Sequence, residues 1–169
     1  MKKCVFLDRD GVINKDYVDY VYSEDKLEIL PGVAEALKTL KENGYLLIVI
    51  TNQSGIAKGI YTIEQMHYCH GLIQERCDKL IDHIYFAPGH PSVSESLSRK
   101  PGTLMFEKAI AKFNVDVQNS WMIGDKDRDL IPARKMGLRT IQVDLDDSVN
   151  ADFKVNSLVD CVPLILGEV

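Results

Sequence analysis

Residues 5–13 read VFLDRDGVI, in which an apolar run leads directly into two aspartates, Asp8 and Asp10. The run is typical of a strand buried on both faces of a sheet, so the aspartates fall where the chain leaves the core. Ligands of open parallel sheets bind beyond the carboxyl ends of the strands. We therefore expect Asp8 and Asp10 to lie at a functional site.

Further along the chain, apolar runs of strand length alternate with longer segments of helical periodicity. The predicted strands are residues 2–8, 45–52, 81–88, 120–125 and 138–144. The predicted helices are residues 31–44, 63–80, 103–114 and 128–137, with a further helical turn or two in 157–169. Thr62 and Gln65 have the spacing of a capping box at the start of the second helix. The alternation predicts an α/β protein with a Rossmann-like, doubly wound parallel sheet in three α/β/α layers.

Length and composition indicate one folded domain, residues 1–169, because a single core of this size buries most of its apolar surface. The formal charge of −5 and the lack of a Lys/Arg cluster argue against a nucleic-acid partner. The N-terminus lacks the apolar region of a signal peptide, and no apolar run approaches the roughly 20 residues that span a bilayer. The cysteines have no CxxC spacing, which favours free buried thiols. We expect a monomeric cytoplasmic protein that acts on a small molecule, without a membrane partner.

Polar side chains also mark the ends of the later predicted strands. The second strand ends in Thr51 and Asn52, the loop after the third holds Lys100, and the fourth is followed by Asp125 and Asp129. Each residue alone is equally typical of a turn, a helix cap or a solvated loop. Because all of them follow strands of one parallel sheet, we expect them to converge with the two aspartates of the first strand.

The chemistry of these residues suits phosphoryl transfer. Two carboxylates at adjacent strand ends repel each other, and Mg²⁺ between Asp8 and Asp125 would relieve this repulsion. An oxygen of Asp8 could then attack phosphorus, while Asp10 protonates the leaving oxygen and later deprotonates water. Thr51 and Lys100 would hold the remaining phosphoryl oxygens. These roles predict a phosphatase that works through an aspartyl phosphate.

The same motifs resemble those of the haloacid dehalogenase (HAD) superfamily of phosphatases over almost the entire chain. The DxDGV motif matches residues 8–12, the second-motif threonine matches Thr51, the lysine matches Lys100, and GDxxxD matches residues 124–129. The resemblance implies that Asp8 is the nucleophile and Asp10 the general acid/base. It also implies magnesium ligands from the side chains of Asp8 and Asp125 and from the carbonyl of Asp10.

Finer matches favour one branch of the superfamily. The segments FLDRDGVIN, TNQSGIAKG, RKP and GDKDRD resemble the D-glycero-D-manno-heptose 1,7-bisphosphate 7-phosphatases and the related histidinol-phosphate phosphatases. Both groups are capless, and the gaps between the motifs are too short for a lid domain of the usual kind. Substrate choice is therefore expected to depend on the loops 13–24, 52–59 and 88–101.

The chain departs from this branch in one loop. Relatives carry a zinc loop of the form C-P-H-H-P followed by C-x-C-R-K-P, and this chain has APGHP and SLSRKP instead. The ligand positions are occupied by Ala87, Gly89, Ser96 and Ser98. None of these side chains offers the thiolate or imidazole of a structural zinc site, so we predict no zinc. The pair His67 and His70 is expected to lie on a helix face without a metal.

Local cations suit a substrate with a second phosphate despite the acidic total charge. Arg99 is the best candidate, since a guanidinium binds phosphate oxygens in pairs, whereas Arg9 is equally compatible with a surface charge. With the resemblance, the predicted substrate-binding residues are Asn52, Gln53, Arg99 and Lys126. The leading hypothesis is a magnesium-dependent heptose-bisphosphate phosphatase in the supply of heptose for bacterial lipopolysaccharide. Alternatives are a histidinol-phosphate phosphatase and a noncatalytic phosphosugar-binding protein of this fold.

Overall fold

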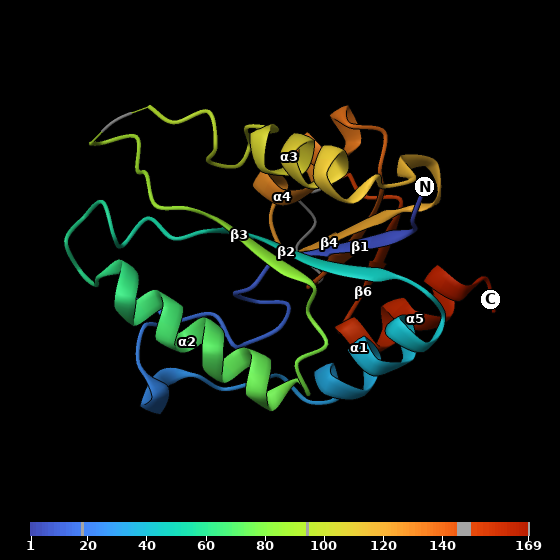
Figure 1. The fold of residues 1–169 in the computed structure, drawn as a ribbon, viewed down its shortest axis with the longest axis horizontal. Coiled ribbons are helices and arrows are strands. Elements are labelled where there is room, and N and C mark those ends of the chain that lie inside the picture. Colours follow the sequence, from blue (N-terminus) through green and yellow to red (C-terminus); the bar gives the residue numbers. More distant parts are fainter. Residues whose placement is uncertain (18, 94, 145–149, 169) are drawn as a thin grey trace.

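Six parallel strands form one sheet in the order β3-β2-β1-β4-β5-β6 in the computed structural model (Figure 1). The strands are β1 (Cys4–Leu7), β2 (Leu46–Asn52), β3 (His83–Ala87), β4 (Trp121–Gly124), β5 (Arg139–Val143) and β6 (Phe153–Val155). The helices are α1 (Val33–Glu42), α2 (Ile63–Arg76), α3 (Leu104–Phe113), α4 (Asp127–Lys135) and α5 (Leu158–Leu166), with short 3₁₀ helices at Glu24–Lys26 and Val117–Asn119. This architecture confirms the predicted doubly wound α/β fold.

The structure describes residues 1–17, 19–93, 95–144 and 150–168. Val18 and Ser94, which belong to the predicted substrate loops, lie outside the described residues. The same holds for Val169, at the end of the predicted final helical segment.

The central strand β1 supplies side chains to both layers of the core. Val5 and Leu7 belong to the cluster formed with α1 and α5, whereas Phe6 belongs to the cluster formed with α3 and α4. This division follows from the two-residue period of a strand, which sends successive side chains to opposite faces. Figure 1 shows α3 and α4 above the sheet and α1 and α5 below it. Both faces are therefore covered, which explains why β1 and β2 are apolar without alternation.

The boundaries of α2 show where local sequence signals succeed and where they fail. The predicted capping box is present, because Thr62 Oγ1 accepts from Gln65 N at 3.2 Å and Gln65 Oε1 accepts from Thr62 N at 2.9 Å. The helix ends at Arg76, four residues before the predicted end at residue 80. Asp78 and Lys79 have φ values of 52° and 55°, and this left-handed backbone cannot continue a right-handed helix.

Two elements near the C-terminus differ from the sequence-based prediction. The edge strand β6 was not predicted, since three residues are too few to show an alternating pattern; it pairs with β5 through Ile141 and Phe153. The final segment forms a nine-residue helix, α5, that contains Pro163. All four cysteines are free and buried, as predicted.

The connections beside the sheet are short. One helix, α1, and one 3₁₀ turn lie between β1 and β2, and one helix, α2, lies between β2 and β3. Within the described ranges these connections contain no separate cap domain, in agreement with the predicted capless fold. Among the helices described, none is long and apolar enough to cross a membrane.

Candidate active site

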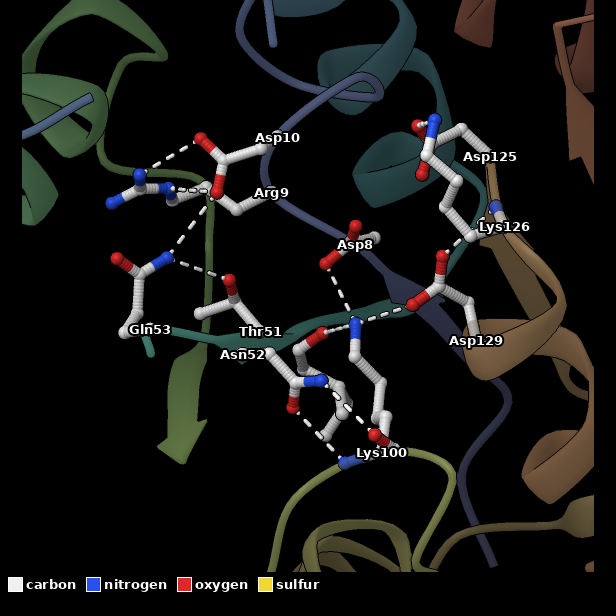
Figure 2. A network of polar contacts seen from close by, with 11 residues as sticks. Asp8, Arg9, Asp10, Thr51, Asn52, Gln53, Lys100, Asp125, Lys126 and Asp129 are labelled. Atoms are coloured by element: carbon white, nitrogen blue, oxygen red, sulfur yellow. Dashed lines mark hydrogen bonds and ion pairs between the residues drawn. The ribbon is translucent and has the colours of Figure 1, made fainter. Parts of the chain in front are cut away.

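The ends of three adjacent strands place the predicted reactive side chains at one edge of the sheet. Asp8 directly follows β1, Thr51 lies near the end of β2, and Asp125 directly follows β4. The backbone N–H of Asp8 donates to the carbonyl of Ile123 at 2.9 Å, which extends the pairing of β1 with β4 up to the nucleophile position. Figure 2 shows the carboxylates of Asp8 and Asp129 beside the ammonium group of Lys100, with Asp125 next to Lys126. The predicted convergence of strand-end residues is therefore present.

Lys100 reaches the centre of this site from the loop after β3. Its Nζ lies 2.7 Å from Asp8 Oδ1 and 2.6 Å from Asp129 Oδ1, and it donates to the carbonyl of Ile50 at 2.6 Å. The side chain of Lys100 is fully buried. Although burial lowers the pKa of Lys100, the adjacent charges of Asp129 and Asp8 outweigh it and raise this pKa above its ordinary value. Lys100 is therefore held as a cation beside Asp8, the predicted nucleophile.

Asn52 fixes the backbone of Lys100. The backbone N–H of Lys100 donates to Asn52 Oδ1 at 3.0 Å, and Asn52 Nδ2 donates to the carbonyl of Lys100 at 3.1 Å. These two hydrogen bonds join the end of β2 to the loop that carries the lysine (Figure 2). Asn52 was predicted to bind substrate. In the structure its side-chain amide also anchors the loop that carries Lys100.

The carboxyl group of Asp8 is buried among other charges. Burial and the charge of Asp129 raise the pKa of Asp8 to about 6, although Lys100 counteracts them. An ionised Asp8 is therefore costly without a further cation nearby. The same carboxyl group must be ionised to act as a nucleophile.

A divalent cation fits the acidic cluster beside Lys100. Asp8, Asp125 and Asp129 each offer an oxygen, and these three oxygens lie within 4.8 Å of one another. Burial and the charge of Asp8 raise the pKa of Asp125, and the buried Oδ1 of Asp125 has no hydrogen-bond partner among the described residues. Lys100 contacts Asp8 and Asp129, but no charged group among the described residues is paired with this oxygen of Asp125, so a cation held by the cluster would satisfy it. Hard divalent cations such as Mg²⁺ prefer carboxylate oxygens of this kind.

Two glycines allow the aspartates to approach one another. Gly11 has a φ of 88°, and a Cβ added there would lie 2.6 Å from Asp125 Oδ2. A Cβ added to Gly124 would lie 2.5 Å from the Cβ of Asp129. Any larger residue at either position would push an acidic side chain out of the cluster.

Asp10 points away from this acidic cluster and pairs with Arg9. Arg9 donates from Nε to Asp10 Oδ2 at 3.0 Å and from Nη2 to Asp10 Oδ1 at 2.8 Å, and Nη2 also reaches the carbonyl of Val21. Arg9 is only 2% exposed, so it is not the surface charge that the sequence also allowed. Burial alone would raise the pKa of Asp10, but the charge and hydrogen bonds of Arg9 hold it below its ordinary value. The side chain that joins the acidic cluster is that of Asp129, not that of Asp10.

Gln53 joins Asp10 to Thr51. Gln53 Nε2 donates to Asp10 Oδ2 at 3.2 Å and to Thr51 Oγ1 at 2.9 Å, while Gln53 Oε1 accepts from the hydroxyl of Tyr61 at 2.7 Å. Both ends of this amide are thus occupied within the protein, and its side chain is buried. Gln53 was predicted to bind substrate; its side chain orients two reactive residues and also lines the cavity next to them.

Removing the hydroxyl of Tyr61 should disturb this arrangement. In Tyr61→Phe, the amide of Gln53 loses the donor that fixes its orientation and can turn its oxygen toward the carboxylate of Asp10. We expect kcat to fall about 5- to 20-fold, with KM changed less, since one buried neutral hydrogen bond contributes about 1 kcal/mol and an unpaired group costs more. Steady-state kinetics would measure both constants.

Tyr22→Phe is the matched control for this prediction. The ring of Tyr22 stacks on that of Tyr61 with centroids 5.3 Å apart, so the control removes a hydroxyl from the same aromatic cluster. Its kcat should stay within about twofold of the wild type. Equal losses in the two variants would show that packing, and not the orientation of Gln53, is responsible.

The remaining predicted binding residues take different positions. Arg99 lines a cavity next to the reactive residues, and its Nη1 donates to the carbonyl of Gly89 at 3.2 Å. Lys126 turns toward the acidic cluster, where its Nζ lies 2.7 Å from Asp125 Oδ2. The structure therefore brings Arg99 to the substrate side and Lys126 to the carboxylate that would hold the metal.

Three of the four positions that were compared with a zinc loop, Gly89, Ser96 and Ser98, lie close together. Ser96 Oγ and Ser98 Oγ are 2.8 Å apart, and a Cβ added to Gly89 would lie 3.1 Å from the Cβ of Ser96. His90 Nδ1 lies 2.6 Å from the hydroxyl of Ser92. The described part of this loop is thus held by local hydrogen bonds, and Asn52 anchors its end.

Sequence reasoning did not identify the roles of three residues at the site. Tyr61 gives no signal in the sequence, because its hydroxyl reaches Gln53 only in the fold. Arg9 could have been recognised as a partner of Asp10 by its adjacency alone, although adjacency does not fix the direction of a side chain. Asp129 lies within a matched motif, and its two contacts with the backbone of Lys126 and the ammonium of Lys100 required the structure.

Comparisons with known proteins agree with this geometry. Residues 10–143 match the family described as haloacid dehalogenase-like hydrolase. The D-glycero-beta-D-manno-heptose-1,7-bisphosphate 7-phosphatase of Haemophilus ducreyi is 37% identical, over 97% of this chain and 98% of that protein. The protein of the same name from Yersinia pestis is 38% identical, over 92% and 91% of the two chains.

A solved structure shares the whole fold. The crystal structure of D,D-heptose 1,7-bisphosphate phosphatase from B. bronchiseptica, complexed with magnesium and phosphate, superposes with a TM-score of 0.90. The two proteins are 26% identical, and the match covers 99% of each chain. Together with the family match over residues 10–143, these similarities show that the chain belongs to the family of haloacid dehalogenase-like hydrolases.

Proposed function

We propose that the protein is a magnesium-dependent phosphatase that removes the 7-phosphate of D-glycero-D-manno-heptose 1,7-bisphosphate. The observation that carries this proposal is the setting of Asp8, a buried carboxylate between the ammonium of Lys100 and the unpartnered oxygen of Asp125. This setting neutralises an attacking carboxylate on one side and leaves room for a cation on the other. The names of the relatives from Haemophilus ducreyi and Yersinia pestis support the choice of substrate.

The reaction proceeds in two steps on Asp8. An oxygen of Asp8 attacks the phosphorus, the bond to the sugar oxygen breaks, and Asp10 gives that oxygen a proton. Asp10 must therefore take up a proton before this step, although Arg9 lowers its pKa in the structure. Water then attacks the aspartyl phosphate, Asp10 takes a proton from this water, and phosphate and free Asp8 are released. Thr51 and Lys100 hold phosphoryl oxygens through both steps, where negative charge persists.

The side chains of Asp8 and Asp125 would hold Mg²⁺. When bound, this ion neutralises the negative charge that gathers between the carboxylates and the phosphoryl group. Asp129 helps to fix the position of Lys100, because the ammonium group of this lysine contacts both Asp129 and Asp8. Asn52 holds the backbone of the same lysine.

The proposal extends to the setting in which the protein works. The chain acts as one domain, residues 1–169, and as a cytoplasmic monomer on a small phosphorylated sugar, without nucleic-acid or membrane partners. The net charge of −5 supports the exclusion of nucleic acid. Size-exclusion chromatography with light scattering would test the monomer.

Phosphate release from a panel of substrates tests the function. The panel contains both anomers of heptose 1,7-bisphosphate, fructose 1,6-bisphosphate, histidinol phosphate and 4-nitrophenyl phosphate, each with and without Mg²⁺. We expect the highest kcat/KM for a heptose bisphosphate. A higher value for histidinol phosphate would favour that activity instead, and no release from any compound would favour a noncatalytic phosphosugar-binding protein.

Removal of divalent cations should abolish activity reversibly. In excess EDTA, the buried carboxylates of Asp8 and Asp125 lie close together without a cation, so nothing on their side offsets the repulsion between them and the incoming phosphoryl group. Phosphate release should fall to background and return when Mg²⁺ exceeds the chelator. Circular dichroism in EDTA serves as the control and should show the native fold, whereas full activity after exhaustive chelation would contradict the metal requirement.

A further inference from the structure

A cavity of about 310 Å³ lies next to Asp10 and Gln53, on the substrate side of the site. Its walls come from four segments: the loop after β1, the loop after β2, the loop after β3 and the first turn of α4. Asn52 and Gln53, both labelled in Figure 2, contribute to the wall nearest the reactive residues. The cavity is therefore the space into which the part of a substrate beyond the reacting phosphate would extend.

The charged side chains of this cavity are unbalanced toward positive charge. Arg9 and Asp10 both line it, but they neutralise each other at 2.8 Å. The remaining charged groups are the three cations Lys58, Arg99 and Arg128 and the one carboxylate Asp16. The cavity therefore carries an excess of positive charge, although the formal charge of the protein is −5.

The cations are not satisfied by carboxylates of the protein. Within the described ranges, none of the three forms an ion pair, and the polar contacts recorded for two of them are with neutral oxygens. Arg99 donates to the carbonyl of Gly89 at 3.2 Å, and Lys58 Nζ donates to the hydroxyl of Tyr20 at 2.9 Å. Burial and the charge of Arg128 lower the pKa of Arg99, so the two guanidinium groups stand close enough to repel each other. An anion placed between them would convert this repulsion into attraction.

Arg128 differs from its neighbour Lys126 in the direction of its side chain. Both lie at the start of α4, but the ammonium of Lys126 pairs with Asp125 at 2.7 Å, whereas Arg128 lines the cavity. At the start of this helix, Lys126 thus contacts the acidic cluster and Arg128 lines the cavity. The charge of Arg128 acts on Asp125 from a distance, but within the described ranges Arg128 forms no ion pair with the acidic cluster, so its guanidinium group is available to a substrate.

We propose that Arg128 and Lys58, together with Arg99, form a subsite for the second phosphate of the substrate, and that Arg128 determines the preference for bisphosphates over monophosphates. The proposal rests on the proposed function for the reacting phosphate and adds the recognition of a second dianionic group. Two guanidinium groups bind phosphate oxygens in pairs, and the ammonium of Lys58 adds a third charge from the opposite loop. Asp16 limits the excess charge and leaves a net attraction for a dianion.

Selectivity measured in Arg128→Gln tests this subsite. The quantity is the ratio of kcat/KM for a bisphosphate to kcat/KM for the matching monophosphate, measured for heptose 1,7-bisphosphate with heptose 7-phosphate and for fructose 1,6-bisphosphate with fructose 6-phosphate. Loss of one guanidinium contact should lower the ratio about 10- to 100-fold, mainly through a higher KM for the bisphosphate. Arg128→Lys, which keeps the charge and loses the paired geometry, should fall between the wild type and Arg128→Gln.

Lys135→Gln is the matched control, since it removes one positive charge from the exposed end of the same helix. Its ratio should equal that of the wild type. An unchanged ratio in Arg128→Gln, or equal losses in Arg128→Gln and Lys135→Gln, would overturn the subsite.

The two substrate pairs separate the subsite from the function on which it rests. If the wild type hydrolyses only the fructose compounds and prefers the bisphosphate, the heptose assignment fails and the fructose ratio still decides the role of Arg128. If the wild type prefers neither bisphosphate over its monophosphate, the subsite is refuted even where heptose 1,7-bisphosphate is hydrolysed.

Discussion

Replacing Asp8 with Asn should reduce phosphate release by about 10⁴-fold or more, because the amide of Asn cannot form the aspartyl phosphate. The other two carboxylates of the cluster cannot take over. Asp125 follows β4 and Asp129 belongs to α4, so neither occupies the position at the end of β1 from which Asp8 attacks. Single-turnover kinetics with a sensitive phosphate assay would measure the residual rate.

The same substitution should leave the fold at least as stable as the wild type at neutral pH and above. The pKa of Asp8 is about 6 in the folded protein, above its ordinary value of 3.8, so ionisation of Asp8 opposes folding. This penalty is absent below pH 3.8, develops as the pH rises from 3.8 to about 6, and is complete above that pH. An Asn at position 8 never carries the charge. In EDTA, the difference between the Tm of Asp8→Asn and that of the wild type should therefore grow as the pH rises from about 4 to about 6 and should change little above about pH 7.

Trapping of the intermediate gives this prediction a second readout. Acid quenching of the wild type during turnover, followed by peptide mass spectrometry, should locate one phosphoryl group on Asp8. The adduct should be missing in Asp8→Asn at unchanged protein concentration. A phosphoryl group on another residue, or substantial turnover by the variant, would exclude Asp8 as the nucleophile.

The sequence predicts the part of the site that the strands place. Asp8, Thr51 and Asp125 follow or end strands of a parallel sheet, and short residues at strand ends have little freedom in where they point. The convergence of these three is therefore a consequence of sheet order and register, which apolar runs reveal well. Lys100 lies on a loop, and its place depends on the two hydrogen bonds of Asn52, for which no periodic pattern exists.

The directions of side chains could not be predicted in the same way. Lys126 and Arg128 are separated by one residue at the start of α4, and only Lys126 was predicted from the sequence to bind substrate. The structure sends Lys126 to Asp125 and Arg128 to the cavity. Likewise, the sequence predicts that Gln53 binds substrate. In the structure, the hydroxyl of Tyr61 fixes the amide of Gln53 so that its nitrogen donates to Asp10 and Thr51. Such assignments depend on long-range partners that one sequence does not reveal.

Replacing Asp10 with Asn should slow turnover by about 10² to 10⁴, the usual contribution of a general acid/base. The amide can neither protonate the leaving oxygen nor take a proton from water. The loss should be larger for a sugar phosphate than for 4-nitrophenyl phosphate, because nitrophenolate leaves without needing a proton. A comparison of the two substrates therefore separates acid catalysis from a general disturbance of the site.

Unlike Asp8→Asn, this substitution should destabilise the protein. The Asp10 carboxylate is 20% exposed and neutralises Arg9, which is 2% exposed, so the variant leaves a buried guanidinium without its counter-ion. Removing one partner of a buried pair costs on the order of 3 kcal/mol, which corresponds to a fall in Tm of roughly 6–12 °C for a chain of this size. Because the pKa of Asp10 is lowered in the folded state, its stabilising effect is complete at neutral pH and is lost as the pH falls through that lowered value. Asp19→Asn, at an exposed carboxylate in the same loop, is the control and should change neither property. If Asp10→Asn lost activity equally on both substrates and kept the wild-type Tm, Asp10 would be neither the acid nor the counter-ion of Arg9.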